Sequence, residues 1–141
     1  MEQVRSLVEG FIVGSPYGRL LGVVTEAIEV DRVRFRLPYR DTLTTIGDMV
    51  HGGALAGLVD VAATAACWAS PTVDPSARGT TIGFTINYLN PGRGQDLIAT
   101  AEVIQRGQSI VIAEVSIHGV DATLVARAVV TYKLSQARKE K

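Results

Sequence analysis

The chain has 141 residues, 47% hydrophobic and 20% charged, and its 14 basic side chains balance its 14 acidic ones. This length fits a single domain over residues 1–141, and the zero net charge argues against the broad basic surface of a nucleic-acid-binding protein. An N-terminus without a signal pattern, apolar runs too short for a membrane helix and a single cysteine, Cys67, together predict a cytoplasmic protein with no membrane partner.

The first predicted elements are a short helix and two strands. Apolar residues spaced three to four apart predict an amphipathic helix over residues 2–13, which the turn-forming sequence GSPYG ends. Residues 21–37 change to a period of two, with arginines alternating with apolar residues, which predicts half-exposed strands. The sequence PYRDTLTTIGDM has turn residues and little periodicity and predicts a loop.

A long helix and four strands follow. The run from Gly52 to Trp68 has the length and alanine content of a helix, and because it is apolar all round, other structure must cover it. Four alternating segments joined by short turns then predict antiparallel strands over residues 80–89, 96–105, 109–118 and 122–134. The charged tail, 135–141, predicts a frayed end. The predicted class is α+β, a long central helix enfolded by an antiparallel sheet of about six strands.

Asp60 is the one charged residue in the predicted helix between Gly52 and Trp68. Burying an unpaired carboxylate costs several kcal/mol. The position therefore predicts either a bonded structural carboxylate or one that does chemistry. Thr64 shares its helix face, where its hydroxyl either holds a water against the acid or bonds its own helix backbone.

The helix begins at His51, Gly52 and Gly53. The glycines let another group approach the backbone, and the unpaired amides and dipole of a first turn stabilise a developing oxyanion. The alternative is a tight helix entry with no chemical role. Because Gly52 and Asp60 lie about 12 Å apart along one helix, they act on one bond only if a second subunit, related by a two-fold axis, supplies one of them.

The segment HGGALAGLVDVAATAA, followed by TIGFTINYLNPGRGQDLIATAEVIQRGQS, resembles the hotdog-fold thioesterases of the phenylacetate-degradation (PaaI-like) branch. Its marks are histidine-glycine-glycine with an acid nine residues after the histidine, and Y-x-x-P-G after the next strand. The resemblance covers about residues 18–134. It implies a hotdog fold, homodimers with shared active sites that often form tetramers, and hydrolysis of acyl- or aroyl-coenzyme A (CoA) thioesters without a cofactor.

The resemblance also implies roles for residues of the long helix. Asp60 matches the catalytic acid, a general base on water or a nucleophile. The backbone amide of Gly52, from the partner subunit, matches the group that polarises the thioester carbonyl. Thr64 matches a hydroxyl that assists in part of the family.

Two further threonines match family positions outside the helix. Thr81 matches a serine or threonine on the next strand and, by alternation, lies opposite the face of Ile82 and Phe84. Thr45 stands six residues before the histidine, where many members have an Asn or Gln that orients the acid or the water. A threonine is shorter and has no amide, which predicts a water held otherwise or reduced turnover.

The remaining candidates are substrate-binding. His51 and Gly53 lie at the helix start, where the family histidine is usually structural. Arg93 and Arg106 fall at predicted turns, where their guanidinium groups either meet CoA phosphates or remain solvated.

Other functions find less support in the sequence. Two histidines and one cysteine without ligand spacing predict no metal site. A hotdog dehydratase needs an aspartate–four residues–histidine arrangement, which Asp48 and His51 do not meet. A non-catalytic acyl-CoA-binding or sensing protein is the alternative that Thr45 leaves open.

Overall fold

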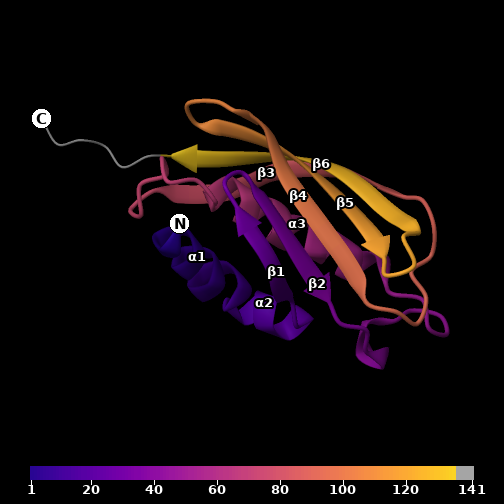
Figure 1. Ribbon diagram of the computed structural model, residues 1–141. Helices are drawn as coiled ribbons and strands as arrows, with labels where there is room; N and C mark the ends of the chain where they lie inside the picture. The colour runs from indigo at the N-terminus through magenta and orange to yellow at the C-terminus, as the bar shows by residue number, and fades with distance from the viewer. Residues whose placement is uncertain (136–141) are drawn as a thin grey trace, which may run out of the picture.

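The computed structural model describes residues 1–135, which form helices and a single sheet (Figure 1). In chain order the elements are α1 (Glu2–Leu7), the π-helix η1 (Val8–Val13), α2 (Pro16–Leu21), β1 (Val24–Glu29), β2 (Arg32–Leu37), the 3-10 helix η2 (Asp41–Leu43), α3 (Gly52–Trp68), β3 (Arg78–Tyr88), β4 (Leu97–Arg106), β5 (Ile110–Gly119) and β6 (Leu124–Ser135). No helix within this described part is long and apolar enough to cross a bilayer.

The six strands form one antiparallel sheet in the order β1-β2-β4-β5-β6-β3. The sheet curls around α3, which packs mainly against β4 and β5, and the N-terminal helices lie beside β1 (Figure 1). The predicted α+β class, a long helix enfolded by six antiparallel strands, is confirmed. The strand β3 pairs only with β6, so its other edge is free within the described chain.

The side of α3 that packs against the sheet consists mainly of short side chains. Its alanines at positions 62, 63, 65 and 66 are fully buried, as are the larger Leu58 and Val59. Because alanine side chains are short, the helix backbone lies close to the strands. The close-packed core that results fixes the orientation of the helix relative to the sheet. The side chains on the partly covered side of α3 therefore project from a firmly packed helix.

The N-terminal segment corrects one prediction. Residues 2–13 are helical as predicted, but GSPYG does not end the helical region, because a second helix, α2, begins at Pro16. The Ser15 hydroxyl accepts a hydrogen bond from the Gly18 amide at 3.0 Å. Proline at the first helical position loses no hydrogen bond and has a suitable φ, so the residue that breaks a helix interior here starts a helix. Gly22 then ends α2 in the left-handed region at φ 81°, and β1 begins at Val24.

The predicted tail needs a smaller correction. Ser135 is the last residue of β6. The rest of the predicted tail, 136–141, lies outside the described residues.

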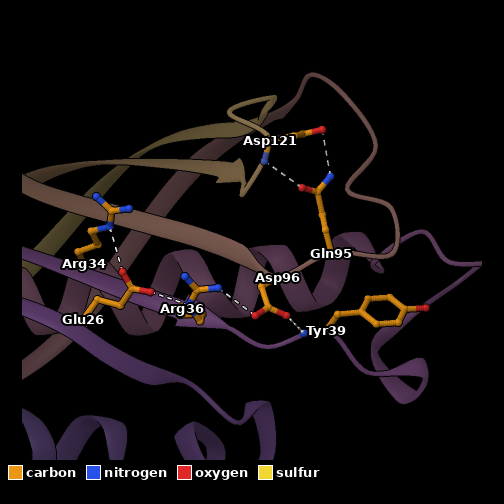
Figure 2. A network of polar contacts seen from close by, with 7 residues as sticks. All are labelled: Glu26, Arg34, Arg36, Tyr39, Gln95, Asp96 and Asp121. Carbon is orange, nitrogen blue, oxygen red and sulfur yellow. Dashed lines mark hydrogen bonds and ion pairs between the residues drawn. The ribbon is translucent and has the colours of Figure 1, made fainter.

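Acidic side chains explain the alternating arginines of β2 (Figure 2). Glu26 pairs with Arg34 at 3.4 Å and Arg36 at 2.5 Å, and Asp96 accepts hydrogen bonds from Arg36 at 3.0 Å and the Tyr39 amide at 2.8 Å. The Tyr39 amide, followed by the Arg36 guanidinium, holds the pKa of Asp96 below its usual value. The network joins β1, β2 and the start of β4, so these arginines have a structural role.

Candidate active site

The start of α3 presents an unpaired amide. His51 is the N-cap residue, because its Nδ1 accepts a hydrogen bond from the Gly53 amide at 2.7 Å. Its carbonyl accepts the amides of Ala54 and Leu55 at 2.9 and 3.1 Å. Within residues 1–135 no acceptor receives the Gly52 amide. That N–H, at the positive end of the helix dipole, can donate to an oxyanion from outside the chain.

Tyr88, on β3, contacts the start of α3, and the sequence analysis did not identify it as a site residue. Its hydroxyl donates a hydrogen bond to the Gly52 carbonyl at 3.0 Å, and a Cβ on Gly52 would lie 3.4 Å from its ring. A hollow of about 380 Å³ is lined in part by Gly52, Tyr88, Leu89 and Gly92. The signal was present, since Tyr88 opens the Y-x-x-P-G sequence that carried the resemblance.

One side of α3 is only partly covered by the described residues. The residues along it recur every three or four positions and are half-buried or exposed; this open face consists of Gly53, Gly57, Asp60, Thr64 and Trp68. The carboxylate of Asp60 is therefore half-buried in the single chain rather than enclosed by its core. The ion pairs of residues 1–135 do not include Asp60.

Thr81 is the residue that contacts the acid. Its hydroxyl donates a hydrogen bond to Asp60 Oδ1 at 2.6 Å. The side predicted for Thr81 is wrong, because β3 has a bulge in which Thr81 pairs with Tyr132, Gly83 pairs with Thr131 and Ile82 is skipped. An extra residue in one strand reverses the alternation. Ile82 is 59% exposed, whereas Thr81 faces the helix on the same side as Phe84, which packs against the core.

Thr64 lies one turn beyond Asp60 and points into an apolar hollow. Within the described chain the Thr64 hydroxyl bonds no backbone carbonyl. This argues against the alternative in which Thr64 only bonds its own helix backbone. The hollow has a volume of about 350 Å³ and also contains Trp68 and Tyr132. The Trp68 Nε1–H donates to the Tyr132 hydroxyl at 2.9 Å, and burial raises the pKa of that hydroxyl.

Thr45 lies in the loop between η2 and the start of α3. It is exposed, and its amide donates to the Met49 carbonyl at 2.9 Å across a tight loop. The Leu43 carbonyl accepts the His51 amide at 2.7 Å, which attaches this loop to the helix start. Thr45 is thus grouped with Gly52 and Gly53 rather than with the acid.

The two candidate arginines differ in their surroundings. Arg93 lies in an exposed turn and pairs with Asp48 at 3.2 Å, both side chains being 53% exposed. Arg106 ends β4, where its guanidinium pairs with Asp31 at 2.8 Å and donates to the Cys67 carbonyl at 2.9 Å. Arg106 is thus occupied at the C-terminal end of α3, and burial raises the pKa of the neighbouring Cys67 thiol to about 12. This arrangement favours a structural role for Arg106.

Within residues 1–135 no group of three or more His, Cys, Asp or Glu side chains could hold a metal ion. The half-buried carboxylate, the hydroxyl bonded to it and the unpaired helix amide are the chemical groups that the chain places along α3. Such a set suits the addition of water to a carbonyl carbon, in which one group accepts a proton and another stabilises an oxyanion.

Comparisons with known proteins agree with this chemistry. Residues 47–126 match the sequence profile of the Thioesterase superfamily. The "Medium/long-chain acyl-CoA thioesterase YigI" of Salmonella typhimurium is 31% identical over 93% of this chain and 94% of its own length. A thioesterase family protein from Silicibacter pomeroyi superposes with a TM-score of 0.88 at 23% identity, over 95% of this chain and 99% of its own.

The PaaI protein of Escherichia coli superposes with a TM-score of 0.83 at 20% identity, over 94% of this chain and 93% of its own. At 20% identity this superposition shows a shared fold only, and it confirms the predicted hotdog fold. Profile match, sequence relative and fold agree with one another. The chain belongs to the Thioesterase superfamily and is a hotdog-fold thioester hydrolase.

Proposed function

We propose that the chain hydrolyses acyl- or aroyl-CoA thioesters, with Asp60 as the catalytic acid. The observation that carries this is the Thr81–Asp60 hydrogen bond of 2.6 Å on the open face of α3. The hydroxyl orients the carboxylate through Oδ1, so within the described chain Oδ2 is left to contact a water. The acyl-CoA thioesterase named among the relatives supports the substrate class.

The chemistry needs few groups. Asp60 accepts a proton from water, whose oxygen forms a bond to the thioester carbonyl carbon, or it attacks that carbon itself and the acyl-enzyme is then hydrolysed. The carbonyl oxygen becomes an oxyanion, which the Gly52 amide of a partner subunit stabilises. The carbon–sulfur bond then breaks, the CoA sulfur takes up the proton, and the free acid leaves.

A homodimer supplies both groups to one substrate. Within one chain Gly52 and Asp60 are about 12 Å apart along the helix axis, but β3 has a free edge. From Gly79 to Tyr88 this edge carries no charged residue and no proline, the features that usually keep an edge strand from pairing. Two copies that pair at β3 about a two-fold axis bring the helix start of one protomer toward Asp60 of the other. Two such dimers form the expected tetramer.

The other candidates take supporting roles in this proposal. Gly53 and the His51 cap shape the helix start that receives the carbonyl. Thr64 helps to hold the attacking water from the same helix as Asp60, and Thr45 does so from the partner subunit, together with that subunit's helix start. Arg93, exposed beside the Gly52 hollow, meets the phosphates of CoA. We do not carry Arg106 into the proposal, because Asp31 and the Cys67 carbonyl already occupy its guanidinium.

The test follows thiol release from a panel of acyl- and aroyl-CoA thioesters, with Asp60→Asn beside the unchanged protein. Loss of a positioned base costs about 10²–10⁴-fold in rate, so we expect the variant to lose kcat by that factor while it still binds substrate. Asp121→Asn is the matched control on an exposed turn and keeps full activity. Unchanged hydrolysis in Asp60→Asn contradicts the role of Asp60.

The same panel of thioesters also tests the alternative, a protein that binds or senses acyl-CoA without hydrolysing it. Tight binding of acyl-CoA without thiol release from any member indicates a binding or sensing protein. Equilibrium sedimentation of the same samples tests the dimer, and a monomer that hydrolyses substrate at the full rate contradicts the shared site.

A further inference from the structure

A hollow bounded by α3 and the N-terminal helical segment begins one turn beyond Asp60. It has a volume of about 350 Å³, and we refer to it as the Thr64 pocket; its lining residues are Leu7, Phe11, Ile12, Thr64, Trp68, Pro75, Ala77 and Tyr132. None of these residues carries a charge, and the only polar side-chain atoms are two hydroxyls and one indole nitrogen. This volume and lining are those of a site for an apolar group.

The pocket is continuous with the candidate catalytic acid. Asp60 bonds Thr81, Thr81 pairs across the sheet with Tyr132, and the Tyr132 hydroxyl accepts the indole N–H of Trp68. Thr64 lies between Asp60 and Trp68 on the same helix face. A thioester whose carbonyl carbon lies at Asp60 can therefore extend its acyl chain into the Thr64 pocket.

The N-terminal wall of the pocket lies outside the segment that matches the superfamily profile. Leu7, Phe11 and Ile12 lie on α1 and η1, outside the residues 47–126 that match the superfamily profile. The π-helix that carries Phe11 leaves its ring 79% exposed at the pocket. An aromatic side chain exposed beside an apolar hollow, on a π-helical turn, is typical of a binding surface.

We propose that the Thr64 pocket receives the acyl chain, that the chain is apolar and uncharged, and that the N-terminal wall and Trp68 limit its length. This inference rests on the proposed thioester hydrolysis. Trp68 is suited to act as the end wall because Tyr132 fixes its indole ring. Each methylene that enters contributes to binding, while a terminal carboxylate would lose its water without gaining a partner.

The test narrows the pocket with Leu7→Trp and compares straight-chain substrates from acetyl-CoA to dodecanoyl-CoA. The matched control is Glu9→Trp, which adds the same side chain to an exposed position on the same segment. We expect kcat/KM of Leu7→Trp to fall about fourfold for each methylene excluded, with acetyl-CoA unchanged. The preferred length becomes shorter in this variant and stays the same in Glu9→Trp.

A second comparison uses the unchanged protein with hexanoyl-CoA and adipoyl-CoA, which have equal carbon number and differ in the terminal carboxylate. We expect kcat/KM to be at least tenfold higher for hexanoyl-CoA. Equal values, or a Leu7→Trp length profile that matches the unchanged protein, would overturn the assignment of the pocket. Phe11→Ala, at an exposed position, gives an independent variant if Leu7→Trp does not fold; it opens the N-terminal wall, so the preferred length becomes longer and acetyl-CoA is unchanged.

Failure of the proposed function has a different signature. If the unchanged protein hydrolyses no thioester, calorimetry with decanoyl-CoA and acetyl-CoA tests the pocket by binding alone. Tighter binding of decanoyl-CoA that Leu7→Trp removes supports the pocket even then, and equal binding of the two thioesters contradicts it.

Discussion

The helix α3 meets charged side chains in two places, and the two are built differently. At its C-terminal end Arg106 contacts Asp31 at 2.8 Å and the Cys67 carbonyl at 2.9 Å. The Arg106 side chain is 21% exposed and that of Asp31 is 38% exposed. In its middle Asp60 has one neutral donor, Thr81, and lies on the open face. A charge that is paired and caps a helix end contributes to stability, whereas the half-buried carboxylate of Asp60 can contact a molecule from outside the chain.

The difference predicts that stability and activity separate between the two places. Replacing Arg106 should affect folding and leave the chemistry of the folded protein intact. Replacing Thr81 should affect the chemistry and leave folding almost intact. The first two predictions test each half of that statement, and the third tests the helix start.

Arg106→Leu should have the largest effect on stability. The change leaves Asp31 and the Cys67 carbonyl without their donor, which costs about 2 kcal/mol in the free energy of unfolding and lowers Tm by about 4–8 °C. Thermal unfolding measures the loss. Arg127→Leu is the control, since its pair with Glu114 is long at 3.5 Å and exposed, and such pairs contribute about 0–1 kcal/mol. Loss of kcat with unchanged Tm would instead place Arg106 in the active site.

Thr81→Val should come next, with its effect on kcat. The substitution keeps the shape of the side chain and removes a hydrogen bond to a carboxylate, worth about 1.5–3 kcal/mol, so kcat falls roughly 10–100-fold. Tm changes little, because the open face is half-exposed. Thr85→Val, at an exposed position of the same strand, provides the comparison and retains activity. A kcat equal to that of the unchanged protein would show that Thr81 does not position the acid.

His51→Ala should have the smallest effect. It removes the acceptor of the Gly53 amide, and loss of an N-cap costs about 1 kcal/mol. Denaturant unfolding measures this, and His51→Asn, which restores a capping oxygen, recovers most of the loss. If His51→Asn recovers stability but not kcat, then the imidazole takes part in the reaction and the structural interpretation of His51 is wrong.

Much of the fold could be predicted from local patterns. Periods of two and of three to four residues are properties of single segments, so the strands and the long helix from Gly52 to Trp68 emerged near their true positions. The helix α2 did not, because proline marks both helix ends and helix starts, and only the Ser15 cap with its Gly18 partner distinguishes them here. The bulge at Ile82 was equally hidden, since an unbroken alternation in the sequence does not show a skipped pairing in the ladder.

The sequence by itself determined the fold class and the family and singled out Asp60 as the candidate acid, because apolar periodicity, the histidine-glycine-glycine start and a lone aspartate in an apolar helix are features of consecutive residues. Tertiary structure alone decided which groups lie beside Asp60 and around the Thr64 pocket. Thr81, Tyr132 and Leu7 come from strands and helices far from Asp60 in the chain, and their meeting depends on strand register and helix packing. These depend on contacts between distant segments, which no local pattern encodes.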